Sequence, residues 1–312
     1  MHWKLRSKIQ NTISLLPSSV SYSMYYWIQR HFGNLTRINP INKLMVAIET
    51  CNRIREQGET VQGKVFFEVG TGRIPIVPIA YWLMGSKKTV TLDLNRYLNS
   101  ELLKESMQYI AQNKDEVLNL FGELLDKERF KELLRLNRES NFLLLEILDL
   151  CQIHYIAPGN AASTFLPEKS IDFYTSYTVF EHIPLNVLLN ILKEGNRIIR
   201  DNGLFVHMID YRDHFSYSDK SISSINFLQF SNSEWGKYAN NRYMYMNRLR
   251  HDDYLGLFEF AGQHILKSQP NTDQYLYKIL TSGDLKLDKK FSSKSKDILA
   301  VNEAWFVSQK YG

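Results

Sequence analysis

The sequence has 312 residues, of which 44% are hydrophobic and 23% charged, and its formal net charge is +5. This is the balance of an ordinary globular chain. The mild positive charge suits an anionic substrate or a membrane surface and does not require nucleic acid. No run of about 18 apolar residues occurs, which excludes a transmembrane helix, and polar residues interrupt a basic start that makes a poor signal peptide. We therefore expect a cytoplasmic protein. Cys51 and Cys151 lie far apart without C-x-x-C spacing, which favours buried free thiols over a disulfide or a metal site.

The order of elements along the chain predicts an α/β protein with a helical N-terminal part. Residues 1–60 show helical periodicity rich in aromatic residues, which predicts two or three helices with a break at residues 39–42. From Lys64 the pattern changes to alternating strands and helices, as in an open sheet. The expected strands are 64–69, 88–93, 153–157, 171–176, 203–210, 263–268 and 302–308. We also expect a helix over 184–200, a helical insertion over about 97–150 and a solvated loop over 281–297. The predicted division is an N-terminal helical cap or lid, 1–60, and a second domain, 61–312, that carries the insertion.

The most informative motif is a strand and glycine turn at residues 65–73, followed by a second strand that ends at Asp93. Gly70 and Gly72 allow a tight turn and a close approach of a ligand, and a carboxylate at the tip of the next strand can accept hydrogen bonds from ribose hydroxyls. A dinucleotide site needs a third glycine to hold a pyrophosphate at a helix N-terminus, but Pro75 stands there. Glu68 would repel a pyrophosphate and could anchor the amino group of a zwitterion. S-adenosylmethionine, with a ribose, an amino-acid tail and no phosphate, fits better.

With residues 158–162, 170–183 and 202–206, these motifs resemble the class I S-adenosylmethionine-dependent methyltransferases over roughly residues 61 to 312. The resemblance implies a Rossmann-like, seven-stranded, mostly parallel sheet of order 3-2-1-4-5-7-6 with strand 7 antiparallel. It also implies that the donor lies over the carboxyl ends of strands 1, 2 and 4. Asn160 stands where an aspartate is common, so its amide oxygen or the backbone would contact the adenine. The cofactor-binding residues that the resemblance implies are Glu68, Gly70, Thr71, Gly72, Asp93, Leu94, Asn160, Ala161, Ser176 and Tyr177.

Candidate bases are expected after strands 4 and 5, because an alcohol acceptor must lose its proton during methyl transfer. After strand 4 stands His182, which either transfers a proton or only holds its loop. After strand 5, His207 and Asp210 could form a histidine–carboxylate dyad, with His214 close by in sequence. The alternative is a polar loop in which Asp210 and Asp213 accept backbone N–H bonds.

Residues that could contact the acceptor come from three regions. Tyr211 and Asp213 belong to the loop after strand 5, and Arg248 could offer a guanidinium fork to a phosphate or carboxylate, although a structural arginine cluster is the alternative. Tyr26 belongs to the aromatic N-terminal helices, which could cover the mouth of the pocket or rest on a membrane interface. No metal site is predicted, because histidines intrude among the carboxylates and Mg²⁺ prefers oxygen ligands.

These observations favour an S-adenosylmethionine-dependent methyltransferase that acts on oxygen of a small molecule, sugar or glycan in a biosynthetic pathway, with a His/Asp general base. N-methylation of a natural product or amino acid is the alternative, and a non-catalytic binding module on the same fold is a more distant one. Nucleic acid is not expected as a substrate, because the basic residues are scattered and residues 176–179 carry no base-flipping motif. The sequence also allows peripheral membrane contact through the N-terminal helices and a homodimer.

Overall fold

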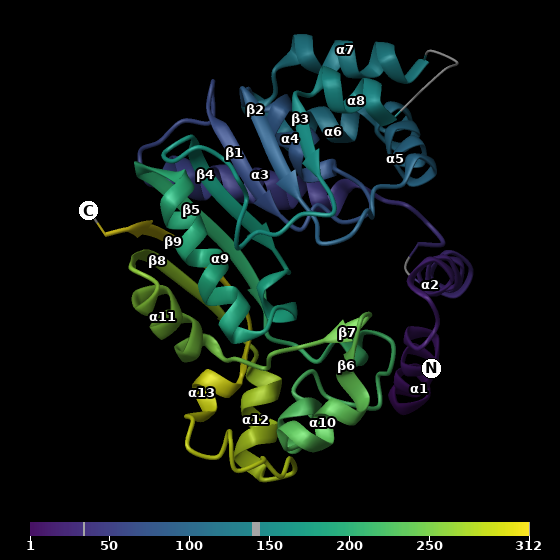
Figure 1. Cartoon of the computed structure of the whole chain (residues 1–312), viewed down its shortest axis with the longest axis vertical. Coiled ribbons are helices and arrows are strands. Elements are labelled where there is room, and N and C mark those ends of the chain that lie inside the picture. Colours follow the sequence, from purple (N-terminus) through teal and green to yellow (C-terminus); the bar gives the residue numbers. More distant parts are fainter. Residues whose placement is uncertain (34, 139–143, 312) are drawn as a thin grey trace.

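The computed structural model describes residues 1–33, 35–138 and 144–311, and its centre is a seven-stranded sheet. The sheet order is β3-β2-β1-β4-β5-β9-β8, and β9 runs antiparallel to both of its neighbours (Figure 1). This confirms the predicted order and the single reversed strand. The strands are β1 (Val65–Val69), β2 (Lys88–Leu92), β3 (Ile153–Ile156), β4 (Ile171–Tyr177), β5 (Ile199–Asp210), β8 (Gln263–Thr272) and β9 (Val301–Lys310).

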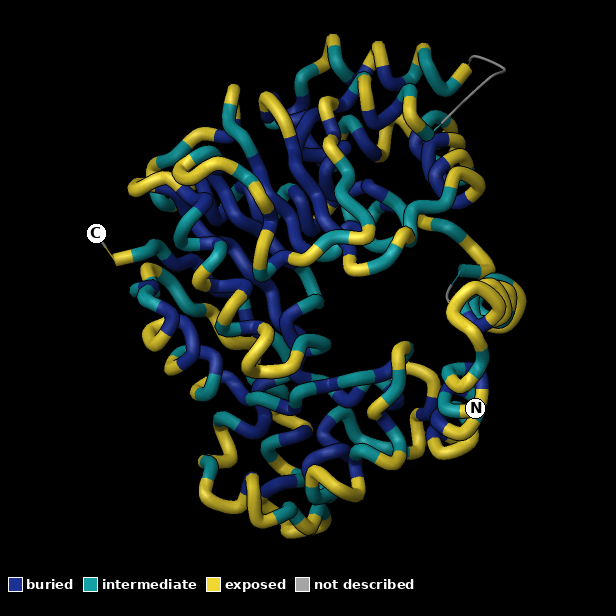
Figure 2. The backbone as a smooth tube through the Cα atoms, viewed as in Figure 1, coloured by how far each residue is buried: buried dark blue, intermediate teal, exposed yellow. Residues whose placement is uncertain are grey.

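Helices cover both faces of the sheet, because its central strands are apolar on both sides. One face packs against α3 (Ile41–Glu56) and α4 (Ile76–Leu83). The other packs against α9 (Leu185–Ile198) and α11 (His251–Phe260). All eight residues of α4 are buried, which explains its uninterrupted hydrophobic sequence. Figure 2 shows the strands as the buried centre of this part of the molecule.

The N-terminal region forms three helices, as predicted, but they pack in different places. α1 (Trp3–Ser14) lies against the C-terminal elements, where Trp3 is buried in an aromatic cluster with Phe215 and Trp235. α2 (Ser18–Phe32) lies near the first glycine loop, and α3 packs directly on the sheet beside α4. Only α1 and α2 therefore stand apart from the sheet, and the division at residue 60 stays a prediction.

The insertion after β2 is helical, as expected. It comprises α5 (Ser100–Gln112), α6 (Lys114–Phe121), the 3₁₀ turn η1 (Gly122–Leu124), α7 (Lys127–Arg138) and α8 (Leu144–Leu150). Residues 139–143 of the predicted insertion lie outside the described residues. Arg129 ties α7 to the sheet layer, since its guanidinium donates to the backbone carbonyls of Trp82 and Ser86 at 2.7 and 2.8 Å.

The elements after β4 and β5 form a third packed cluster below the sheet in Figure 1. They are η2 (Phe180–His182), η3 (His214–Tyr217), η4 (Asn226–Gln229), α10 (Asn232–Ala239), the short strands β6 (Asn240–Asn241) and β7 (Met244–Tyr245), α12 (Gln274–Ser282) and α13 (Lys296–Leu299). The expected loop over 281–297 is confirmed between α12 and α13, although Phe291 within it is fully buried. Cys51 and Cys151 are buried free thiols, as predicted.

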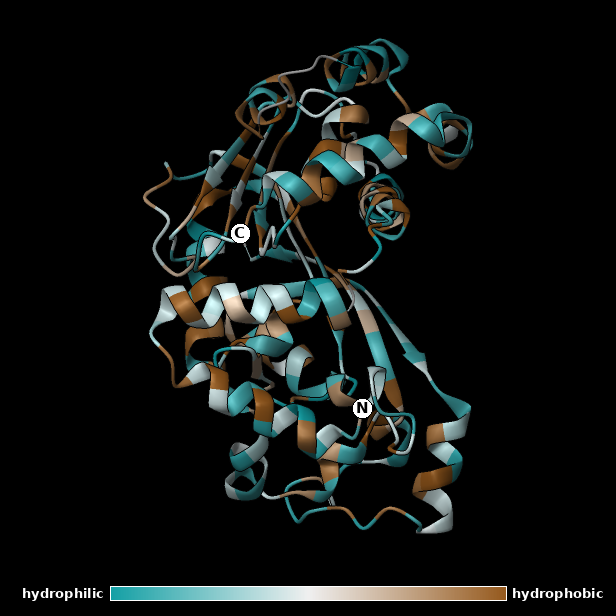
Figure 3. Ribbon diagram, turned by 90° about the vertical axis from the view of Figure 1, so that its right-hand side faces the viewer, coloured by the Kyte–Doolittle hydropathy of each residue, from teal (hydrophilic) through white to brown (hydrophobic). Residues whose placement is uncertain are grey.

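Polar and apolar residues interleave along the helices on the side of α1 and α2 (Figure 3). Among the described residues, none of the helices has both the length and the apolar character that a membrane crossing requires.

Candidate functional site

The first glycine loop follows β1 and is held tightly against its neighbours. Gly70 and Gly72 have φ angles of +88° and +73°, a region that L side chains rarely adopt. The N–H of Gly70 donates to the carbonyl of Leu92 at 2.8 Å. A Cβ atom at Gly70 would lie 2.4 Å from Cγ2 of Val179, so the loops after β1 and β4 meet here without room for a side chain.

Asp93, directly after β2, faces this loop. Its carboxylate accepts from the N–H of Gly72 at 3.1 Å and from the hydroxyl of Tyr155 at 3.1 Å. Burial raises the pKa of Asp93 to about 6, although both hydrogen bonds favour the charged form. The aspartate is therefore partly desolvated, oriented and still able to accept further hydrogen bonds.

Glu68 and Lys43 add opposite charges beside Asp93. Glu68 is 4% exposed and accepts from the hydroxyl of Thr91 at 2.6 Å, and burial raises its pKa to about 7. Lys43 on α3 has its Nζ 3.8 Å from the position of a Cβ on Gly72. Burial lowers the pKa of Lys43, while Glu68 and Asp93 favour its charged form. Two carboxylates and an ammonium thus surround the glycine loop.

The sequence analysis missed Lys43, because α3 was assigned to a cap and not to the sheet layer. One signal was present. Lys43 precedes the buried Ala47 and Thr50 by four and seven residues, so it lies on the inward face of its helix.

The other cofactor-binding predictions lie around the same carboxyl ends of the strands. Leu94 is 73% exposed next to Asp93. Asn160 is exposed, but its amide oxygen already accepts from the N–H of Ala162 at 3.0 Å, and Ala161 is buried in the core. Their role toward a donor stays a prediction, as do those of Thr71, whose hydroxyl bonds to Thr91, and Tyr177, whose ring packs near Trp305.

The predicted dyad of His207 and Asp210 is wrong. The two residues are three positions apart on a regular strand, so their side chains point to opposite faces. His207 is fully buried, and its Nδ1 lies 2.8 Å from Oγ of Ser176, so that hydroxyl is engaged as well. The imidazole stacks on Phe258 with an interplanar angle of 6°, and burial lowers its pKa to about 3. His207 is a neutral core residue.

The structure instead brings His182 and His214 together with Asp210. The two imidazole rings lie 4.8 Å apart in a T-shaped arrangement, and Nε2 of His214 is 3.4 Å from Oδ2 of Asp210. Burial lowers the pKa of His182 to about 4, and the neighbouring His214 acts in the same direction. Asp210 is buried, but hydrogen bonds from His214 and Arg212 outweigh that burial and hold its pKa below the ordinary value. Of the four predicted catalytic residues, three share one edge of the sheet.

Three of the predicted substrate contacts are structural. Tyr211 is 2% exposed and packed in the core. Asp213 is fully buried and accepts from the N–H of Phe215 at 2.9 Å, which confirms the alternative that it caps backbone groups. Arg248 is 3% exposed and donates to the carbonyls of Phe227 and Phe230. None of these three side chains is open to an acceptor.

Tyr26 on α2 remains a candidate. Its hydroxyl donates to Glu101 at 3.1 Å, and its ring lies 4.9 Å from the guanidinium of Arg73 in the first loop. α2 therefore reaches the loop, as a lid would. Its contact with a substrate stays a prediction.

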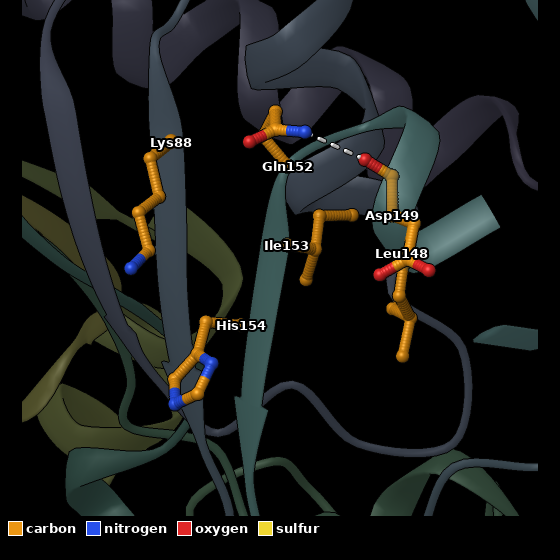
Figure 4. Close-up of a pocket in the computed structure, with 6 residues that line it drawn as sticks. All are labelled: Lys88, Leu148, Asp149, Gln152, Ile153 and His154. Carbon is orange, nitrogen blue, oxygen red and sulfur yellow. Dashed lines mark hydrogen bonds between the residues drawn. The ribbon is translucent and has the colours of Figure 1, made fainter. Parts of the chain in front are cut away.

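A shallow hollow of about 200 Å³ lies elsewhere, at the start of β3 (Figure 4). It is lined by Lys88, Leu148, Asp149, Gln152, Ile153 and His154. Lys88 and Ile153 begin their parallel strands, so the hollow is at the end of the sheet opposite to Asp93. Ligands of open α/β sheets bind at the carboxyl ends of strands, and we therefore assign the functional site to Asp93 and its neighbours.

The strand order, with β9 reversed, is that of the Rossmann-like fold of class I methyltransferases. No family model matches the sequence, and no curated protein sequence matches it significantly. Solved structures are similar at low identity. One is described as a methyltransferase in complex with the Trm112 activator of Haloferax volcanii, with 15% identity, coverage of 92% of this chain and 95% of that chain, and a TM-score of 0.46.

Two further structures give similar values. One is described as a sarcosine dimethylglycine methyltransferase from Galdieria sulphuraria, with 13% identity, coverage of 88% and 91%, and a TM-score of 0.46. The other is described as an S-adenosylmethionine-dependent methyltransferase from Mesorhizobium loti, with 10% identity, coverage of 83% and 96%, and a TM-score of 0.45. At this level of similarity we base the function on the residues of the site.

Proposed function

We propose that this chain is an S-adenosylmethionine-dependent methyltransferase. The observation that carries the proposal is the arrangement of Glu68, Asp93 and Lys43 around a glycine loop in which Gly70 leaves no room for a side chain. A zwitterionic amino-acid tail needs one anionic and one cationic partner, and a ribose needs an acceptor for its hydroxyls. The described residues at this loop offer both, and a pyrophosphate would meet two carboxylates.

Each residue has a defined part in this proposal. Glu68 would accept from the ammonium of the tail, Lys43 would pair with its carboxylate, and Asp93 would accept from the ribose hydroxyls. The donor, when bound, supplies an electrophilic methyl group on a sulfonium. The chain then has to exclude water and align the acceptor.

We further propose that the acceptor is an oxygen of a small molecule, sugar or glycan. The support is the polar edge formed by His182, His214 and Asp210, which can hold an acceptor hydroxyl and organise the loss of its proton. The alternative remains an amine, which needs little base catalysis once it is neutral. Loss of activity in a His214→Ala variant favours the oxygen acceptor, and activity that survives the loss of both histidines favours the amine.

A binding experiment tests the proposed donor. Isothermal titration with S-adenosylhomocysteine should give one site per chain, and NAD should give none. Lys43→Met should weaken binding by roughly tenfold or more, as expected for a lost charge-assisted contact. Lys64→Met is the matched control, because Lys64 pairs with Glu59 away from the loop. Failure of the folded protein to bind S-adenosylhomocysteine contradicts the proposal, as does equal weakening by both lysine variants.

A further inference from the structure

Three residues near the carboxyl ends of β4 and β5 form a group with the chemistry of a metal site. Glu181 and His182 lie on η2 after β4, and His214 begins η3 after β5. One ligand atom from each residue lies within 4.8 Å of the other two. Among the described residues, this is the group whose histidines, cysteines and carboxylates come close enough to hold an ion.

The carboxylate of Glu181 is an independent sign that a ligand is missing from the protein chain alone. Glu181 is 2% exposed, and neither of its oxygens makes a hydrogen bond with ordinary geometry to any described residue. Its polar neighbours are the backbone N–H groups of Glu181 and Asp210 and, further away, the guanidinium of Arg212. A buried carboxylate without a partner is costly unless a cation or a proton compensates it.

The two histidines are oriented as metal ligands usually are. Nδ1 of His182 lies 2.8 Å from the carbonyl oxygen of Tyr245, so this nitrogen carries the proton and Nε2 is left with a free lone pair. His214 has the carboxylate of Asp210 at 3.4 Å from its Nε2. Asp210 is itself held by Arg212 at 2.8 Å. Backbone carbonyls and carboxylates in these positions fix the tautomer and the orientation of a ligating imidazole.

From this geometry we propose that Glu181, His182 and His214 bind a divalent first-row transition-metal ion. Two imidazoles and one carboxylate suit Zn²⁺ or Mn²⁺ better than Mg²⁺, which takes oxygen ligands. Two atoms bonded to one ion at about 2.1 Å lie no more than ~4.2 Å apart, so the most distant pair must approach by several tenths of an ångström. Side-chain rotation on the short turns η2 and η3 provides that movement.

The site would leave coordination positions for a further ligand, because three protein ligands do not complete the shell of such an ion. Both histidines are partly exposed, so water or an oxygen of an acceptor can approach. This extends the proposed function, on which it rests, since an ion next to the glycine loop would bind and orient an acceptor hydroxyl. Val179, two residues before Glu181, packs against that loop at Gly70.

Metal titration of the EDTA-treated full chain tests the site. Calorimetry should show one tight site per chain for Zn²⁺ and for Mn²⁺, and Mg²⁺ should bind at least about 100-fold more weakly. Co²⁺ should show visible absorption typical of nitrogen and oxygen ligands. His182→Ala and His214→Ala should each weaken Zn²⁺ binding by more than the roughly 10–100-fold that outer-shell changes cause. His154→Ala is the control, because His154 is exposed on β3, and it should bind like the unaltered chain.

Glu181→Gln separates a metal ligand from a merely structural residue. Removal of a buried, unpartnered charge should raise the melting temperature in EDTA. The same variant should lose the increase in melting temperature that Zn²⁺ gives the unaltered chain. Equal Zn²⁺ binding by the unaltered chain and by all three variants at the site overturns the proposal, and so does equal loss in His154→Ala.

Binding of S-adenosylhomocysteine, measured in EDTA on the same samples, keeps the two proposals apart. If it binds and the metal does not, the metal site alone is wrong. If Zn²⁺ binds as expected and S-adenosylhomocysteine does not, the metal site stands and the methyltransferase proposal fails.

Discussion

Ser176 on β4 and His207 on β5 face each other within the sheet, with the serine Oγ 2.8 Å from the imidazole Nδ1. Both residues are buried, and the second ring nitrogen of His207 has no partner among the described residues. The serine hydroxyl is therefore the polar contact that makes the buried imidazole tolerable.

Ser176→Ala should consequently act on stability. The variant leaves Nδ1 of His207 unpaired, which should lower the free energy of unfolding by about 1–3 kcal/mol. Urea denaturation measures the loss, with Ser233→Ala on the exposed face of α10 as a control that should stay within about 0.5 kcal/mol of the unaltered chain. Unchanged stability together with a shifted pH profile of methyl transfer would instead restore a catalytic role for His207.

Gly70→Ala should disturb both the fold and the donor site. Its φ of +88° is unfavourable for alanine, by about 1–2 kcal/mol, and the new Cβ would lie 2.4 Å from Cγ2 of Val179. We expect a loss of stability beyond the conformational cost and at least about tenfold weaker binding of S-adenosylhomocysteine.

Gly58→Ala is the matched control for Gly70→Ala. Gly58 has a φ of +80° and no atom within 4 Å of the position of its Cβ. It should therefore show the conformational cost alone and keep its affinity. Equal effects of the two variants on binding would contradict the close approach of the loops at Gly70.

Much of the fold could be predicted, because buried parallel strands are nearly continuous apolar runs and the turns between them carry glycine. β5 begins at residue 199, four residues earlier than expected, since Ile199 pairs with Ile171 ahead of an irregularity in the ladder. Such pairing depends on the neighbouring strand and leaves no local signal.

The site divides in the same way. The strand-tip carboxylates of Glu68 and Asp93 follow from strand positions, whereas Lys43 reaches the loop only through the packing of α3. The dyad of His207 and Asp210 failed for a reason already present in the sequence, because residues three apart on a strand point to opposite faces. Proximity in sequence was a poor substitute for that alternation.

Arg248→Lys tests the structural role of the guanidinium. Arg248 donates to two backbone carbonyls and to Oδ1 of Asn232, at 2.6 to 2.8 Å. An ammonium cannot reproduce this fork, so the free energy of unfolding should fall by about 1–3 kcal/mol while the affinity for S-adenosylhomocysteine is unchanged. Arg242→Lys, at an exposed position, is the control for thermal denaturation and should leave stability nearly unaltered. A stable Arg248→Lys variant with a higher KM for the acceptor would contradict this interpretation.

Protonation of Glu68 should make donor binding depend on pH. Burial raises the pKa of Glu68 to about 7 in the free protein, and an ammonium group bound beside it favours the charged form. Below that pH, binding must release a proton, so the affinity for S-adenosylhomocysteine should fall by up to about tenfold per pH unit as the pH drops from about 8 to about 6. Asp93, with its pKa raised to about 6, should add to the loss at the acidic end.

The same shift has the opposite sign for the stability of the ligand-free chain. The folded pKa of Glu68 lies above its ordinary value of 4.5, so the folded state holds the proton more tightly than the unfolded state. This contribution to stability is present at low pH and is lost as the pH rises from about 4.5 to about 7. Glu68→Gln should therefore bind more weakly at pH 8, show a flatter pH dependence of affinity, and lose less stability across this interval. Calorimetry and urea denaturation over the pH series measure both effects, and parallel pH curves for the variant and the unaltered chain would show that Glu68 neither titrates in this range nor contacts the donor.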